Sequence, residues 1–140
     1  MTKLDALQSI LLNVDGNDFH APAKRMYQTF HRSKNIKVYR SGKQIPAKFD
    51  CLKEKIPFKK IITKGNRTLY IAEDGIVFIG DKPKIIRDLQ IGEMLKIEKD
   101  SEDGYDEIAS IEEYEQSSDY TFTLGGTESY ITFDGIIICN

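Results

Sequence analysis

Only four residues carry a thiol or an imidazole, and their number and spacing limit the chemistry open to this chain. They are Cys51, Cys139, His20 and His31. Two cysteines are too few for a disulfide framework, and neither stands at a metal-ligand spacing. These residues argue against a zinc site, and no metal or organic cofactor is expected. We expect both histidines to be structural or exposed and Cys51 to be an inert thiol.

Length and composition favour one folded domain. The chain has 140 residues, of which 40% are apolar and 30% charged. No stretch approaches the roughly 18 apolar residues of a membrane span. Residues 1–18 carry an early acid and lack a small-residue cleavage site, which argues against a secretion signal. We expect a soluble, intracellular protein, either cytoplasmic or phage-encoded.

Charge is distributed unevenly along the chain. Residues 1–64 contain 14 Lys and Arg against 5 Asp and Glu, whereas residues 65–140 contain 6 against 17. One interpretation is an electrostatic partner for the basic half. The other is that the two halves attract each other within one domain. Aromatic residues are interleaved through the basic residues 24–64, as in nucleic-acid binders, but no nucleic-acid-binding motif accompanies them.

The pattern of apolar residues changes near residue 33. Helical spacing from Leu4 to Leu11 predicts one short helix, and Pro22 predicts the start of a second. Residues 1–33 are therefore predicted to form a helical extension. Residues 34–140 are predicted to be a β domain, because short alternating strands are separated by turn signals. The clearest signals are Asp74-Gly75 and Asp134-Gly135.

The C-terminal sequence carries a resemblance to a known family. Residues 120–124, 125–131 and 134–140 (YTFTL, GGTESYI and DGIIICN) resemble the C-terminal motifs of inteins, which end in Asn. Residues 87–95 (RDLQIGEML) resemble a further conserved segment of the same fold. The order and spacing of these motifs cover about residues 34–140. The resemblance implies a mainly β, horseshoe-shaped Hint fold.

The resemblance also implies autocatalytic, single-turnover protein splicing. In inteins the terminal Asn, here Asn140, closes its side-chain amide onto its own carbonyl and cuts the next peptide bond. Catalysis then consists mainly of holding the reacting groups in place. Cys139 stands where inteins usually have His, and its thiol could tune the reaction or simply pack in the strand. Glu128 replaces a second assisting His and could shuttle a proton if buried. Thr121 stands at a position that usually holds an acid or a thiol.

Other family features are missing, which leaves two interpretations. Inteins start with Cys or Ser, but position 1 is Met1. Ala72 and Gly75 stand where the family has a Thr-x-x-His motif. The chain could be the C-terminal fragment of a split intein that splices in trans. It would then lack some strands of the fold. Alternatively, it is a decayed domain that binds an acidic peptide or nucleic acid.

The split interpretation predicts specific partners. A short, acidic N-terminal fragment would supply the nucleophile and dock on the basic half, and flanking host-protein segments would be joined. No membrane partner is expected, and nucleic acid is disfavoured. The expected docking residues are Lys53, Lys55, Lys59 and Lys60.

Overall fold

The computed structural model describes residues 2–128 and 130–139 and shows a mainly β protein. Within these residues lie fourteen strands and one α-helix, α1 (Ala23–Phe30). A 3-10 turn covers Ile86–Asp88. The strands are β1 (Thr2–Leu4), β2 (Ser9–Val14), β3 (Asn17–Pro22), β4 (Ile36–Arg40), β5 (Lys43–Lys53), β6 (Phe58–Thr63), β7 (Thr68–Ala72), β8 (Ile76–Ile79), β9 (Lys82–Ile85), β10 (Met94–Lys99), β11 (Glu102–Tyr114), β12 (Tyr120–Gly126), β13 (Tyr130–Phe133) and β14 (Ile136–Cys139). Among the described residues, no helix is long and apolar enough to cross a membrane.

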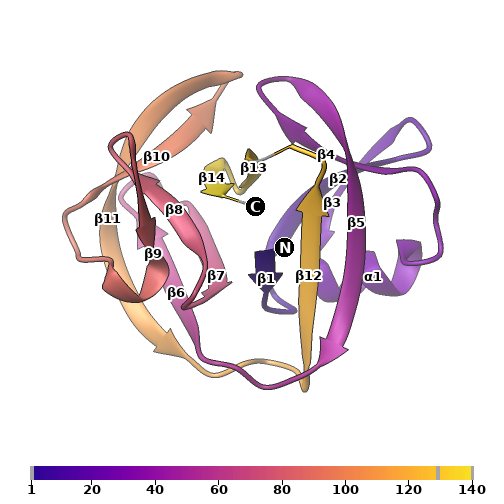
Figure 1. Ribbon diagram of the computed structural model, residues 1–140, viewed down its shortest axis with the longest axis horizontal. Helices are drawn as coiled ribbons and strands as arrows, with labels where there is room; N and C mark the ends of the chain where they lie inside the picture. The colour runs from indigo at the N-terminus through magenta and orange to yellow at the C-terminus, as the bar shows by residue number, and fades with distance from the viewer. Residues whose placement is uncertain (1, 129, 140) are drawn as a thin grey trace.

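The strands form one strongly curved antiparallel sheet shaped like a horseshoe (Figure 1). Its order is β13-β14-β8-β10-β11-β6-β7-β1-β12-β5-β4-β2-β3, with β9 paired to β8. One arm consists of β6 to β11, and the other contains β2 to β5 with α1 (Figure 1). The strands β1, β12, β13 and β14 lie between the arms. The prediction of a mainly β horseshoe is confirmed.

The predicted helical extension over residues 1–33 is mostly wrong. Its first helix, over Leu4–Leu11, is replaced by β1, a turn and β2. Leu7 and Leu11 are 50% and 44% exposed, so the helical spacing of the apolar residues does not mark one buried face. Strand β1 also belongs to the sheet, since it pairs with β12 on one side and with β7 on the other. The second helix is confirmed as α1, which follows Pro22 and buries Met26.

Ion pairs join the basic and acidic halves of the chain. Lys59 on β6 lies 3.6 Å from Glu113 on β11, and Lys55 lies 3.5 Å from Asp119. Lys64, directly after β6, pairs with Glu107 of β11. Internal attraction, one of the two interpretations of the uneven charge, therefore accounts for part of it.

Candidate functional site at the C-terminal strand

Strand β14 leads directly to Asn140, which itself lies outside the described residues. Ile136, Ile137 and Ile138 are buried, and Cys139 is half-buried. Cys139 lies opposite Tyr130 of β13 on one side and Ile76 of β8 on the other. The residue before Asn140 is therefore held between two strands.

The Asp134-Gly135 turn before β14 is held by two strands of one arm, β7 and β10. Both residues have positive φ angles, 49° and 77°, as the predicted hairpin turn requires. The Thr68 N–H donates to Asp134 Oδ2 at 2.8 Å, and the Glu98 N–H donates to the Gly135 carbonyl at 2.7 Å. A Cβ at Gly135 would lie 3.1 Å from Arg67 Nε and 3.2 Å from the Glu98 carbonyl oxygen. The close approach and the positive φ both favour glycine here.

Ala72 and Gly75, at the positions that match the family's Thr-x-x-His motif, carry no polar side chain, and Gly75 lies beside β14. Gly75 directly precedes Ile76, the β8 partner of Cys139. Its N–H donates to the Ala72 carbonyl at 3.0 Å. A Cβ at position 75 would lie 2.8 Å from the Cδ1 of Ile71. Ile71 therefore occupies the space that a histidine would need.

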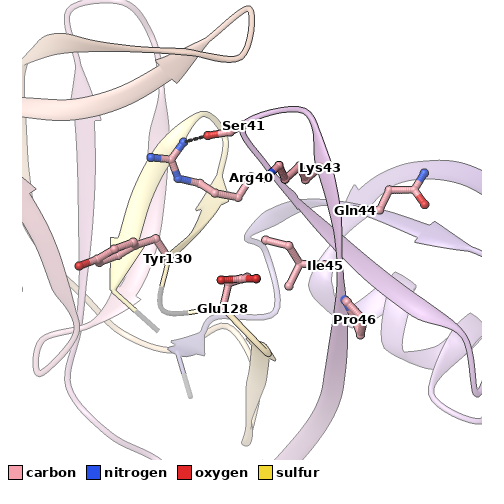
Figure 2. Close-up of a pocket in the computed structure, with 8 residues that line it drawn as sticks. All are labelled: Arg40, Ser41, Lys43, Gln44, Ile45, Pro46, Glu128 and Tyr130. Atoms are coloured by element: carbon pink, nitrogen blue, oxygen red, sulfur yellow. Dashed lines mark hydrogen bonds between the residues drawn. The ribbon is translucent and has the colours of Figure 1, made fainter.

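Glu128 lies on the loop between β12 and β13 and faces an open cavity (Figure 2). The cavity has a volume of about 250 Å³. The Glu128 side chain is exposed, so the burial on which its proton-shuttling role depended is absent. The lining residues are Arg40, Ser41, Lys43, Gln44, Ile45, Pro46, Glu128 and Tyr130.

A second cavity, of about 180 Å³, shares Arg40 and Tyr130 with the first. Its other lining residues are Phe78, Asp81, Lys96 and Ile137 of β14. Hydrogen bonds from Tyr105, at 2.8 Å, and from Lys96, at 3.2 Å, hold the pKa of the Asp81 carboxyl below its usual value. The two cavities place charged groups beside β13 and β14.

Thr121 plays a structural part. It lies at the start of β12, is fully buried, and donates through its hydroxyl to the Glu54 carbonyl at 3.1 Å. The same oxygen accepts a hydrogen bond from Gln116 at 3.1 Å. Two residues later, Thr123 is also buried and pairs with Lys3 of β1.

The four predicted docking lysines do not form one free basic surface. Lys59 is paired with Glu113, and Lys55 with Asp119. The Lys60 ammonium lies 5.4 Å from the centre of the Tyr70 ring. Lys53 is exposed, opposite Tyr120.

An ion pair that sequence reasoning missed closes the two arms. Arg40, at the end of β4, pairs with Glu98 of β10 and lies 3.2 Å from Asp103 of β11. Its guanidinium also donates to the Ser41 hydroxyl at 2.7 Å (Figure 2). No signal in the sequence links Arg40 to Glu98, because 58 residues separate them. Within residues 2–128 and 130–139, no group of three or more His, Cys, Asp or Glu side chains could hold a metal ion.

The fold can be compared with solved structures. No family model and no curated protein matches the sequence. The transcription factor IIB Mvu mini-intein matches with a TM-score of 0.81, at 18% identity, over 98% of this chain and 99% of that one. An intein from a hyperthermophile matches with a TM-score of 0.78, at 16% identity, over the whole of both chains. A DnaB intein from Synechocystis sp. PCC 6803 matches with a TM-score of 0.78, at 16% identity, over 99% of this chain and 98% of that one.

This chain has the intein (Hint) fold. The resemblance in the C-terminal sequence is thereby confirmed at the level of the fold. The Hint fold here includes β1 to β5, which a C-terminal fragment would lack in part. Among the described residues, β1 lies within the sheet, between β7 and β12.

Proposed function

We propose that this chain is an intein-like autoprocessing domain that cleaves the peptide bond after Asn140. The observation that carries the proposal is the fixed position of β14. Its first residue follows a turn held by Thr68 and Glu98, and its last described residue, Cys139, lies between two strands. Asn140 is bonded directly to Cys139, so the residue on its N-terminal side is held in place by two strands.

The chemistry requires little beyond this support. The side-chain nitrogen of Asn140 attacks the carbonyl carbon of the same residue and closes a five-membered succinimide. The bond to the next residue breaks, and the leaving amine takes up the proton that the amide loses. Because the reaction is intramolecular, holding the two groups close together can supply a large part of the rate increase.

The N-terminal half of the family reaction has less support. In inteins a Thr-x-x-His motif polarises the N-terminal scissile bond, but Ala72 and Gly75 stand at those positions. Ile71 fills the adjacent space. We therefore propose C-terminal cleavage as the primary activity.

Splicing in trans is a narrower form of the same proposal. A separate acidic fragment would dock on Lys53, Lys55, Lys59 and Lys60 and supply the nucleophile. Its support is the basic character of residues 24–64. Against it stand the internal partners of Lys55, Lys59 and Lys60 and the match over 99% of the chain of a mini-intein.

The test extends the chain past Asn140 with Ser and a reporter protein. Release of the reporter should leave a succinimide, which is lighter than the hydrolysis product by one water in an intact-mass measurement. Asn140→Ala should abolish release, because alanine has no amide nitrogen. Asn140→Gln keeps the amide but requires a six-membered ring, so release should be much slower.

The remaining candidates are tested in the same assay. Cys139→Ala should slow release only moderately if the thiol tunes the site, and Glu128→Gln should slow it more if this carboxyl moves a proton. Release that begins only after an acidic, Cys-bearing fragment is added would favour the trans form. If the parent and Asn140→Ala release reporter equally, the proposal is wrong.

A further inference from the structure

The C-terminal hairpin, β13 with β14, is attached to both arms of the horseshoe. On one side, the Thr132 hydroxyl donates to the Tyr39 carbonyl of β4 at 3.2 Å. On the other side, the Glu98 N–H of β10 donates to the Gly135 carbonyl at 2.7 Å, and Ile97 pairs with Ile136. The position of the hairpin therefore depends on the spacing between β4 and β10.

The two attachment points are joined to each other by side chains. Arg40 follows Tyr39 directly, and its guanidinium forms an ion pair with the carboxylate of Glu98. The same carboxylate accepts the Ser41 N–H at 2.5 Å. Glu98 thus holds the hairpin with its backbone and the opposite arm with its side chain.

This ion pair is shielded from solvent. The side chains of Arg40 and Glu98 are 17% and 12% exposed, whereas those of Lys55 and Asp119 are 63% and 70% exposed. Shielded pairs are screened less by salt, and losing one partner leaves a poorly solvated charge. The arms also touch beside the pair, since a Cβ at Gly42 would lie 3.0 Å from Ser101 Oγ.

We infer that Arg40 and Glu98 are positioning residues for cleavage after Asn140. By fixing the spacing between β4 and β10, the pair sets where the hairpin, and hence Cys139, is held. This inference rests on the proposed function, because it concerns the rate of that reaction. Neither residue is assigned a contact with the reacting atoms.

The test measures two quantities in Glu98→Gln, which keeps an acceptor for Ser41 but removes the charge. The rate of reporter release should fall about tenfold, because small displacements of reacting groups cost large factors in rate. Hydrogen exchange of the Ile136, Ile137 and Ile138 amides should become faster. Arg40→Lys keeps the charge but loses the planar guanidinium. Its release rate and its exchange rates in β14 should therefore lie between those of the parent and those of Arg40→Gln.

Glu93→Gln is a matched control. Glu93 also combines an ion pair, with Lys84 at 2.8 Å, and a backbone hydrogen bond, from Gln90 at 2.6 Å. It contacts neither β13 nor β14 in the hydrogen bonds and strand pairings of the described residues. Glu93→Gln should leave both the release rate and exchange in β14 within twofold of the parent.

The outcomes separate this inference from the proposed function. If the parent releases no reporter, the proposed function fails, and faster exchange in Glu98→Gln would still show that the pair holds the hairpin. If the parent is active and Glu98→Gln matches Glu93→Gln in both quantities while remaining folded, the inference is overturned. Faster exchange throughout the sheet, rather than in β14, would also overturn it, because the pair would then only stabilise the fold.

Discussion

The Cδ1 methyl of Ile71 fills the space beside the α-carbon of Gly75. A Cβ added there would lie 2.8 Å from this methyl, 3.0 Å from Ile71 Cγ1 and 3.2 Å from the Ala72 carbonyl oxygen. Ile71 is fully buried and pairs with Leu4 of β1. The contact therefore connects the turn before β8 to the centre of the sheet.

This contact predicts energetic coupling between the two positions. Gly75→Ala should lower the free energy of unfolding by about 1–3 kcal/mol, because the core there is already filled. In an Ile71→Val background, which removes Cδ1, the same change should cost less. Urea denaturation of the four proteins of this cycle measures the coupling. Gly104→Ala is the control, since its nearest contact would be Ile97 Cγ1 at 3.8 Å. Purely additive effects would contradict the prediction.

The carboxylate of Asp134 should contribute to stability through Thr68. Asp134→Ala should destabilise the protein by about 1–3 kcal/mol, because it loses the 2.8 Å hydrogen bond and places alanine at a φ of 49°. Asp15→Ala provides the matched control. Asp15 has a φ of 51° in the β2–β3 turn but no side-chain hydrogen bond among the described residues. Thermal and urea unfolding measure both variants. The additional loss of unfolding free energy in Asp134→Ala, compared with Asp15→Ala, is the contribution of the hydrogen bond. Equal losses would mean that the bond contributes nothing.

The sequence reveals turns better than it reveals the N-terminal strands. Asp134-Gly135 is a hairpin turn as predicted, because Asp and Gly adopt the positive φ angles that such turns need. Leu4–Leu11 was wrongly predicted as a helix, because a chance 3.6-residue spacing hides two strands separated by a turn. Nothing local could correct this error, since β1 gains its pairing from β12, about 120 residues later.

The candidate site shows the same limit. The position of β14 follows from local patterns, namely an apolar run after an Asp-Gly turn. The pairing of Arg40 with Glu98 does not, because it depends on how the two arms close in space. Its place in a motif predicts a site role for Thr121, but the Thr121 hydroxyl donates to the Glu54 carbonyl and accepts from Gln116.

Asp106 should make stability depend on pH. Burial, the strongest single influence, raises the pKa of this carboxyl. Hydrogen bonds from Thr63, Arg67 and the Gly65 N–H, together with the Arg67 charge, lower it more, so the pKa lies below its ordinary value. The folded state therefore favours the carboxylate. Its stabilisation is present above the unfolded pKa of about 3.9 and is lost as pH falls through the lower folded pKa.

Asp106→Asn should remove this dependence. At neutral pH the variant should be less stable than the parent by about 1–3 kcal/mol, because Arg67 and Thr63 lose a charged acceptor. As pH falls below about 4, the difference should shrink because the parent's carboxylate becomes protonated. Urea midpoints across this range measure it. Parallel pH profiles for the two proteins would rule out Asp106 as the titrating group.

Lys59 and Lys53 should respond differently to charge reversal. The Lys59 side chain is 14% exposed, and its ammonium lies 3.3 Å from the Arg87 carbonyl and 3.6 Å from Glu113. Lys59→Glu should lower the unfolding free energy by more than about 1 kcal/mol, because it places a second acid beside these acceptors. Lys53→Glu, at an exposed position, should change it by at most about 0.5 kcal/mol. Calorimetry compares them. If both substitutions change the unfolding free energy by the same small amount, the internal contacts of Lys59 contribute little, and Lys59 stays a candidate docking residue.

The central place of β1 has a consequence for the timing of synthesis. Thr2, Lys3 and Leu4 pair with Leu124, Thr123 and Phe122, so β1 leaves the ribosome about 120 residues before its partner β12. Such long-range pairing slows folding, since a long loop must close before the contact stabilises anything. Translation must therefore extend through β12 before the sheet can close around β14. Any cleavage that depends on this closure has to wait until β12 and β14 have both left the ribosome.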